Sequence, residues 1–181
     1  VLKPGKIKAG DPVTFVPRIY SLMVITLSDR ASRGIYEDKS GPRVVEILDE
    51  FFMKLNWQHK INHHIIPDDE NNLHNLLKEA INGQVDFVIT TGGTGIGPRD
   101  ITPEVVRSVI DKEIPGIMEM IRMKYGMEKP NALLSRSVAG VAGKTIIYAL
   151  PGSVKAVNEY MAEISKSMKH TLYMLHGLDA H

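Results

Sequence analysis

Short apolar segments and amphipathic segments alternate along this chain, and this alternation restricts the fold more than any other feature. Apolar runs rich in β-forming residues predict strands at residues 19–27, 60–66, 85–91 and 144–150. Between and after these runs, apolar residues recur at spacings of three and four, which predicts helices. Strands joined through helices are typical of a parallel sheet with right-handed crossovers and helices on both faces. We therefore predict an α/β, three-layer sandwich with a mostly parallel sheet.

Capping residues and helix breakers predict where the helices begin and end. Ser40 is a candidate N-cap for the first helix, and Gly83 is predicted to end the second. Thr102 has a hydroxyl suited to an N-cap, and Pro103 follows it at the first helical position. A long final helix is predicted to start at about Ser153.

Composition excludes several classes of protein. The chain has 22 Lys and Arg against 21 Asp and Glu, a formal charge of +1, so no net basic field favours nucleic acid or an anionic membrane as a partner. The absence of Cys excludes disulfides, thiolate metal sites and Cys nucleophiles. No apolar run reaches the roughly 18 residues of a membrane span, and the first residues lack the apolar core of a secretory signal. We expect a cytoplasmic protein.

Two regions are expected along the chain. Residues 1–18 contain several Pro and Gly and are predicted to form an irregular arm, with a short hairpin over residues 5–15. Residues 19–181 carry all the predicted strands and helices, and are expected to form one domain.

Polar loops follow the predicted strands. Ligands of parallel α/β sheets bind beyond the carboxyl ends of the strands, so residues of these loops are expected to meet at one rim. The candidates are Ser28-Asp29-Arg30, Pro67-Asp68-Asp69, the stretch from Gly92 to Asp100, and Pro151-Gly152-Ser153.

The glycine-rich loop is the most informative of these. Its four glycines, at 92, 93, 95 and 97, allow positive φ and a close approach of the backbone to a ligand. Successive N–H groups can then form a nest for phosphate. Pro98-Arg99 stands where a Walker A loop needs Lys-Ser/Thr, and the dinucleotide fingerprint is absent. The alternative is a flexible connection, whose ordering would cost conformational entropy.

Acidic residues flank this loop in the predicted fold. A carboxylate beside a phosphate nest repels the ligand unless a cation lies between them, and Mg²⁺ takes one or two carboxylates together with phosphate oxygens. Asp100 and either Asp68 or Asp69 are the candidate ligands. Each has a structural alternative, because Asp68 or Asp69 can cap the next helix and Asp100 can act as an anion at a helix N-terminus. Arg99 is a direct candidate for pairing with phosphate.

Further candidates are weaker. Ser28 can donate to a ligand, whereas Asp29 and Arg30 can form a surface pair of little energetic value. Arg136, between Ser135 and Ser137, is a candidate anion contact. The histidines around the second predicted strand are interpreted as surface or partly satisfied side chains.

The segment Thr-Thr-Gly-Gly-Thr-Gly-Ile-Gly-Pro-Arg-Asp-Ile-Thr-Pro-Glu, residues 90–104, resembles the signature of the molybdenum cofactor biosynthesis family that includes MogA, MoaB and a domain of gephyrin. Residues 25–42, 65–70, 134–140 and 149–153 resemble its other motifs, in the same order. The likeness covers residues 20–175, and the motifs at 31–42 and 134–140 are more similar to MogA than to MoaB.

This resemblance implies a MogA-like three-layer fold, a homotrimer, and molybdopterin adenylyltransferase activity. Such an enzyme is a Mg²⁺-dependent nucleotidyltransferase that transfers AMP from ATP to the molybdopterin phosphate and releases pyrophosphate, before a molybdenum-insertion enzyme uses the product. It implies that Asp68 and Asp100 are catalytic and hold the metal. It also implies that the remaining loop candidates bind phosphate, nucleotide or pterin, namely Ser28, Asp29, Arg30, Thr91, Gly92, Gly93, Thr94, Gly95, Arg99, Ser135, Arg136, Ser137, Pro151, Gly152 and Ser153.

Two features depart from the family pattern. Val154 stands where members usually have a second proline, so a looser loop is expected there. Residues 5–13 are similar to the end of a MOSC domain, which implies that the arm is the remnant of an upstream domain. The alternative functions are a pterin-binding scaffold without catalysis and a nucleotide pyrophosphatase.

Overall fold

The computed structural model describes residues 8–11 and 16–177 and has an α/β fold with one six-stranded sheet. The strand order is β2-β1-β3-β6-β5-β4, and the first four of these strands are parallel, whereas β5 and β4 are antiparallel to their neighbours. The strands are β1 (Tyr20–Leu27), β2 (His59–Ile66), β3 (Phe87–Thr91), β4 (Lys112–Glu113), β5 (Val138–Ala142) and β6 (Thr145–Leu150).

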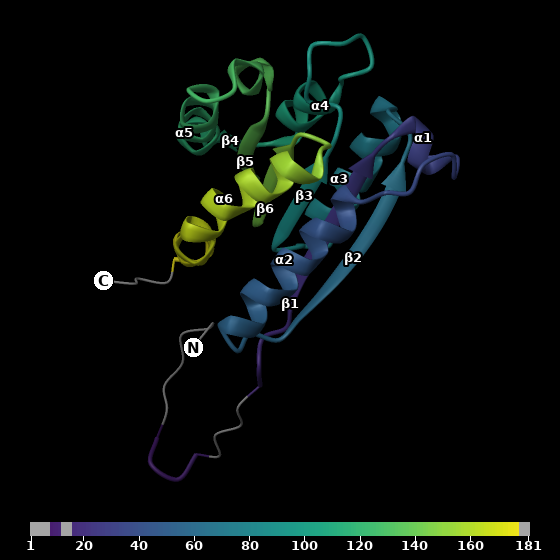
Figure 1. The fold of residues 1–181 in the computed structure, drawn as a ribbon. Helices are drawn as coiled ribbons and strands as arrows, with labels where there is room; N and C mark the ends of the chain where they lie inside the picture. Colours follow the sequence, from purple (N-terminus) through teal and green to yellow (C-terminus); the bar gives the residue numbers. More distant parts are fainter. Residues whose placement is uncertain (1–7, 12–15, 178–181) are drawn as a thin grey trace.

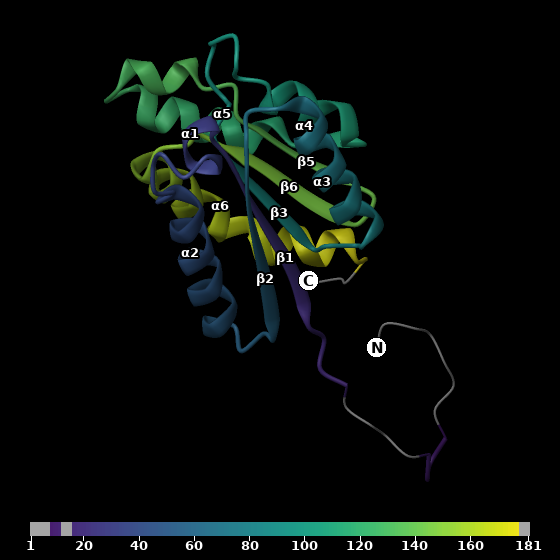
Figure 2. The ribbon, with the colours of Figure 1, turned by 90° about the vertical axis from the view of Figure 1, so that its right-hand side faces the viewer.

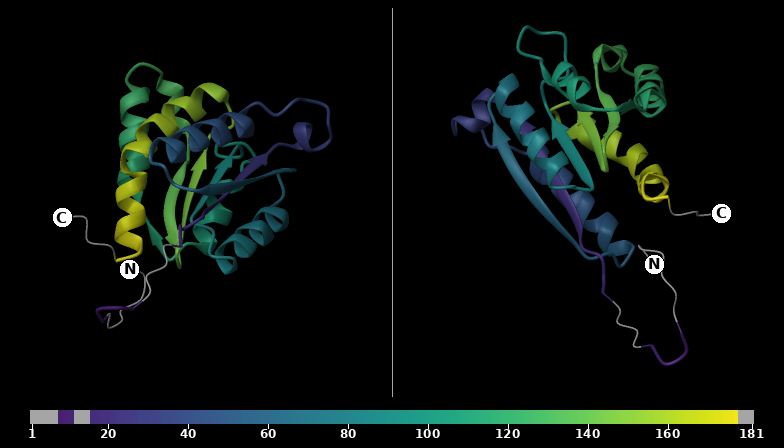
Figure 3. Two further views of the ribbon diagram at one scale, coloured as in Figure 1. Left: turned by 90° about the horizontal axis from the view of Figure 1, so that it is seen from below. Right: turned by 180° about the vertical axis from the view of Figure 1, so that it is seen from behind.

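Helices cover both faces of this sheet, which makes three layers (Figures 1 and 2). Helices α2, α5 and α6 share one apolar core with the sheet, and α3 and α4 share a second core on the other face. The views from below and behind show the same layers, with α6 and α3 on opposite sides of the strands (Figure 3). The helices are α1 (Asp29–Ser32), α2 (Ser40–Lys54), α3 (Glu70–Asn82), α4 (Thr102–Val109), α5 (Pro115–Gly126) and α6 (Val154–Leu175), with a 3₁₀ helix η1 (Pro130–Leu134).

The alternation of strands and helices predicted the parallel half of the sheet correctly. The antiparallel strands β4 and β5 were not predicted, because β4 has two residues and β5 is rich in Ala and Gly, which are poor β-formers. The hairpin expected over residues 5–15 lies largely outside the described residues. Within the described part of the chain, no helix is long and apolar enough to cross a membrane.

Two of the predicted helix caps were wrong. The side chain of Ser40 does not cap α2; instead the carboxylate of Asp38 accepts hydrogen bonds from the N–H groups of Ser40 and Gly41, at 2.9 and 3.1 Å. Thr102 does not cap α4, because its buried hydroxyl donates to the carbonyl oxygen of Gly92 at 2.9 Å. The Ser40 hydroxyl instead contacts Asp38 and Thr91, and the Thr102 hydroxyl contacts Gly92.

The other two predicted helix boundaries are confirmed. Gly83 is the C-cap of α3, and the Ser153 hydroxyl caps α6 by accepting from the N–H of Ala156 at 3.1 Å. Helix α6 begins at Val154 without the family's proline, because this cap fixes its first turn.

The aromatic core under α2 allows a test of the packing. Phe52 is fully buried and contacts the rings of Tyr20, Trp57 and Phe87. We predict that Phe52→Ala lowers the free energy of unfolding by about 3–5 kcal/mol, because it removes a large apolar side chain and leaves a cavity. Denaturant unfolding measures this change. Met53→Ala, at an exposed neighbouring position, should change it by less than about 0.5 kcal/mol, and an equal loss in both variants would contradict the assignment.

Candidate functional site

The parallel strands end in register, which brings their following loops to one rim. Leu27 of β1 pairs with Ile66 of β2, Thr26 pairs with Thr91 of β3, and Thr91 pairs with Leu150 of β6. Strand β1 leads to α2 on one face of the sheet, and its neighbour β3 leads to α4 on the other face, so the loops diverge between β1 and β3. Such a switch point is where open α/β sheets bind ligands. In Figure 1 the rim is at the upper end of the strands.

The glycine loop lies tightly against the rim. Gly92 has φ +99°, and a Cβ there would be 2.3 Å from the carbonyl oxygen of Leu27, so a larger residue does not fit. Besides its hydroxyl, Thr102 uses its backbone N–H, which donates to the Gly93 oxygen at 3.0 Å. The conformation of the loop is therefore fixed by the end of β1 and the start of α4.

Arg136 holds the same loop from the other side. Its Nε donates to the Gly95 oxygen at 2.6 Å and its backbone N–H to the Thr94 oxygen at 2.9 Å. Its guanidinium also donates to the backbone carbonyl oxygen of Asp100 and pairs with the Glu104 carboxylate. Arg136 thus shapes the loop through its carbonyl groups, while its direct contact with an anion stays a prediction.

Backbone donors of the loop remain available for a ligand. Among the described residues, the N–H groups of Gly93, Thr94 and Gly95 have no hydrogen-bond partner. Their carbonyl oxygens accept from Thr102 and Arg136, so the loop is held through its carbonyl groups and not through these N–H groups. Free N–H groups on a glycine-rich turn are the features of an anion nest.

The two predicted catalytic acids lie against this loop. The Asp100 Oδ2 accepts from the Gly97 N–H at 2.7 Å and lies 2.8 Å from where a Cβ of Gly95 would be. The Asp68 Oδ1 lies 3.6 Å from the equivalent position at Gly93. The structure thus brings together two carboxylates that are far apart in the sequence.

The structure separates the roles of Asp68 and Asp69. The Asp69 carboxylate is the N-cap of α3 and accepts from the Asn72 N–H at 2.9 Å. Asp68 is therefore not needed as the cap and faces the rim, where it exchanges backbone-to-carboxylate hydrogen bonds with Asp29 at 3.1 and 3.2 Å.

Negative charge gathers at this point. Burial raises the pKa of Asp68 above its ordinary value, and the charges of Asp29 and Asp100 add to the rise, against the Asp29 N–H and the Arg99 guanidinium. Arg99 donates to the Asp29 carboxylate at 2.6 Å and to the Asp68 carbonyl oxygen at 3.1 Å. Arg99 thus pairs with Asp29 and lies beside Asp68, which offsets only part of the negative charge, and a further cation would be stabilised there.

The donor set suits Mg²⁺. Asp68 and Asp100 offer hard oxygen ligands, and one or two carboxylates with phosphate oxygens and water are what this ion takes from enzymes. Within the described residues, no group of three or more acidic or His side chains is arranged to hold a metal. A metal bound here would therefore depend on oxygens of the substrate.

The remaining predicted residues take varied positions. The Ser28 hydroxyl caps α1, and Arg30 lies over the ring of Tyr36, 5.2 Å from its centroid, rather than pairing with Asp29. The expected surface pair of Asp29 and Arg30 was wrong, because Asp29 pairs with Arg99 instead. The Ser135 and Ser137 hydroxyls hydrogen-bond to each other at 2.6 Å beside the glycine loop.

Two hollows adjoin at the rim and share Gly152 and Ser153. One, of about 490 Å³, lies over the glycine loop. Its remaining lining residues are Gly92, Gly93, Thr94, Gly95, Ile96, Asp100, Asn131, Leu134, Ser135 and Pro151. The other, of about 380 Å³, lies between the end of β1 and the start of α2, and is lined by Thr26, Leu27, Ser28, Ala31, Tyr36, Asp38, Lys39, Ser40 and Val154.

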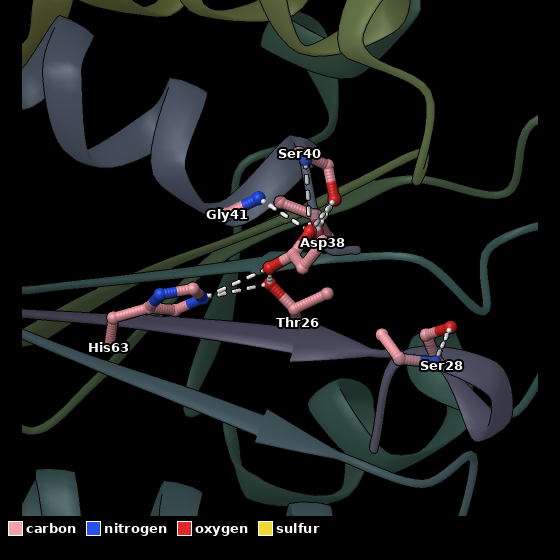
Figure 4. A network of polar contacts seen from close by, with 8 residues as sticks. Thr26, Ser28, Asp38, Ser40, Gly41 and His63 are labelled. Carbon is pink, nitrogen blue, oxygen red and sulfur yellow. Dashed lines mark hydrogen bonds and ion pairs between the residues drawn. The ribbon is translucent and has the colours of Figure 1, made fainter. Parts of the chain in front are cut away.

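Sequence reasoning missed the side chains under the second hollow. Asp38 accepts hydrogen bonds from Thr26 and Ser40 (Figure 4). Ser40 also contacts the Thr91 hydroxyl at 2.9 Å. Asp38 and Ser40 lie inside the stretch 25–42 that resembles a family motif, and this was the available signal. Neither residue follows a strand directly, so the loop rule did not select them.

This geometry defines a class: an α/β domain that carries a glycine-rich loop with the features of an anion nest at the switch point of its sheet. Residues 23–170 match the model of the family described as "Probable molybdopterin binding domain". The chain belongs to this family.

Relatives support this membership. The chain is 36% identical over 155 residues to the molybdopterin adenylyltransferase of Helicobacter pylori strain J99, which covers 85% of this chain and 86% of the relative. The solved Mog protein of Mycobacterium ulcerans is 36% identical, with a TM-score of 0.77 over 86% of this chain and 99% of that one. The MoaB enzyme of Thermus thermophilus is 32% identical, with a TM-score of 0.78 over 87% and 97%.

The cap assignment at α3 can be tested on its own. We predict that Asp69→Ala lowers the free energy of unfolding by about 0.5–2 kcal/mol, because the Asn72 N–H loses its acceptor. Asp69→Asn, which retains an acceptor, should stay close to the wild type. Urea unfolding of both variants measures the difference, and equal stabilities for Ala and Asn would contradict the cap.

Proposed function

We propose that this protein is a Mg²⁺-dependent molybdopterin adenylyltransferase of the cytoplasm. It transfers AMP from ATP to the terminal phosphate of molybdopterin, and a molybdenum-insertion enzyme consumes the adenylylated product. The observation that carries this proposal is the placement of Asp68 and Asp100 against one glycine loop with unpaired N–H groups. Relatives of similar length bear the name of this activity.

The reaction joins two anions, so charge and positioning dominate its barrier. An oxygen of the molybdopterin phosphate forms a bond to the α-phosphorus of ATP, and the bond from that phosphorus to the bridging oxygen of pyrophosphate breaks. Holding both reactants in line can supply about 7–11 kcal/mol of the barrier. Because the nucleophile is already an anion, no side chain has to be activated for covalent catalysis.

The residues of the chain supply orientation and hydrogen bonds. The N–H groups of Gly93, Thr94 and Gly95 bind phosphate oxygens, each charge-assisted bond contributing about 1.5–3 kcal/mol. Arg136 and Thr102 keep these groups in place by holding the loop's carbonyl oxygens. Asp68 and Asp100 would hold Mg²⁺, which when bound neutralises phosphate charge.

The two adjoining hollows suit a reaction of two substrates. They share Gly152 and Ser153, so ligands in both would meet at the start of α6. The hollow over the glycine loop carries the free N–H groups and the Asp100 carboxylate, and its chemistry is that of a phosphate site.

Replacing either acid tests the proposal. We predict that Asp68→Asn and Asp100→Asn each lower pyrophosphate release from ATP and molybdopterin by about a hundredfold or more. Asp69→Asn is the matched control, because it changes the neighbouring acid and keeps the cap. The folded fraction of each variant is checked by thermal unfolding. Undiminished release from Asp68→Asn or Asp100→Asn would overturn the assignment.

The same assay separates the alternative functions. Molybdopterin binding without consumption of ATP would identify a scaffold instead. Hydrolysis of ATP in the absence of any pterin would identify a nucleotide pyrophosphatase. A rise in melting temperature with Mg²⁺ and ATP, and a further rise with pterin, is expected for the transferase.

We also propose that three copies of the chain form a homotrimer. Apolar side chains of α5, η1 and the residues next to them are exposed to solvent, between 44% and 85%, and Leu134 continues this surface into the hollow over the glycine loop. An apolar surface of this kind is typical of an interface. Its members are Met120, Met123, Met127, Leu133 and Leu134.

Charge placed on this surface should dissociate the assembly. We predict a trimer for the wild type by light scattering after size exclusion, and a monomer for Met123→Lys combined with Met127→Lys. Met53→Lys, at a similarly exposed methionine of α2, is the control and should remain trimeric. A monomeric wild type, or a trimer that survives the double change, would contradict the proposed surface.

A further inference from the structure

A carboxylate without a role in the proposed chemistry lies buried at the switch point of the sheet. Only 4% of the Asp38 side chain is exposed. It accepts from the hydroxyl of Thr26 at 2.6 Å and from the hydroxyl and N–H of Ser40 at 3.0 and 2.9 Å. The N–H of Gly41 donates to it at 3.1 Å, and the Nε2 of His63 is 3.2 Å away. Figure 4 shows these groups gathered around Asp38.

The packing around this carboxylate leaves no room for a residue larger than glycine at position 41. A Cβ at Gly41 would lie 2.2 Å from the His63 Nε2, 2.3 Å from the Thr26 Oγ1 and 2.5 Å from the Asp38 Oδ2. The first turn of α2 can approach the strands only because this residue is glycine. Residues from β1, β2, the loop and α2 thus meet at one point.

The charge on Asp38 determines the direction of each hydrogen bond. Although burial raises the pKa of Asp38, hydrogen bonds from Thr26, Gly41 and Ser40 outweigh it and hold the pKa below its ordinary value. An ionised carboxylate only accepts hydrogen bonds, so Thr26 and Ser40 each donate their single hydroxyl hydrogen to it. In its contact with the His63 Nε2 at 3.0 Å, Thr26 can then only accept, so the proton is on Nε2, where it faces both Thr26 and the Asp38 carboxylate.

The same reasoning extends to the end of β3. Because Ser40 donates to Asp38, its oxygen is left to accept from the Thr91 hydroxyl at 2.9 Å. Thr91 is fully buried and is the last residue before Gly92, where the glycine loop departs from the sheet. A chain of hydroxyls therefore runs from Asp38 to the base of the loop.

We propose that Asp38 is a positioning residue, which holds the end of β3 through Ser40 and Thr91 and so sets the place from which the glycine loop departs. The importance of this placement for catalysis rests on the proposed adenylyl transfer. Asp38 itself touches no reacting atom in this proposal. Its effect is to keep the N–H groups and Asp100 of the glycine loop correctly placed relative to the hollow between β1 and α2.

Replacing Asp38 should reverse the direction of the hydrogen bonds between position 38, Thr26 and His63, and this reversal can be observed. In Asp38→Asn, the amide oxygen must face the N–H donors of Ser40 and Gly41, which places the NH₂ group toward Thr26. Thr26 would then accept from Asn and donate to His63, whose proton moves from Nε2 to Nδ1. Nitrogen chemical shifts of the imidazole report this change of tautomer without any ligand.

The test of positioning uses hydroxyl variants at the base of the loop. We expect Thr91→Val, which keeps the shape and loses the hydroxyl, to shift the amide resonances of Gly92 and Gly93 and to accelerate their hydrogen exchange. Thr91→Ser, which keeps the hydroxyl, should leave both close to the wild type. Asp49→Asn is the control, because it breaks a similar pair with His59 between α2 and β2, away from the rim.

In the transfer assay, Asp38→Asn and Thr91→Val should lower kcat by about tenfold or more, with smaller changes in KM. The double variant should lose less than the product of the two single effects, because both act through one chain. Unchanged loop amides in Thr91→Val, or fully multiplicative effects, would overturn the proposal. If the wild type shows no transfer, the proposed function fails, whereas the tautomer and the loop amides still decide the role of Asp38.

Discussion

The parallel pairing of β1 with β3 is the constraint on which the site depends. It places Leu27 beside the start of the glycine loop, where the carbonyl oxygen of Leu27 leaves no space for a Cβ at Gly92. The loop must turn with positive φ at this point and then stays folded over the rim. Its conformation is a consequence of sheet register, so its N–H groups are ordered before any ligand arrives, which lowers the entropy cost of binding.

Charge is the second organising element of the rim. The acids at 29, 68 and 100 lie close enough that two of them raise the pKa of the third, and Arg99 balances only part of that charge. Such an excess of carboxylate is costly in a folded protein unless a ligand relieves it, and it is typical of functional sites. On the other side of the same crevice, the buried Asp38 is fully hydrogen-bonded and serves the structure instead.

The sequence predicted the fold class, the parallel half of the sheet and the rim, because hydrophobic periodicity and the loops after strands follow simple geometric rules. It predicted the meeting of Asp68 and Asp100, yet it could not tell which of Asp68 and Asp69 caps α3, since both suit a cap. The partners of the Thr102 and Ser40 hydroxyls were missed, because the Gly92 carbonyl oxygen and the Thr91 hydroxyl come within reach only when the glycine loop and the sheet are folded. The role of Arg136 as a support of the loop was also not predictable, because strand β5 lacks the signals of a strand.

The antiparallel direction of β5 has a consequence for how this domain can vary. A strand that runs against its neighbours brings its beginning, not its end, to the rim, so the residues before Val138 arrive beside the glycine loop. The support of the loop is thus encoded in a segment that lies outside the repeating strand–helix units. Exchanges in this segment at the lining residues Asn131, Leu134 and Ser135 can therefore remodel one wall of the crevice, as long as Arg136 keeps its contacts with the glycine loop, which gives this fold a separate region for adapting to different ligands.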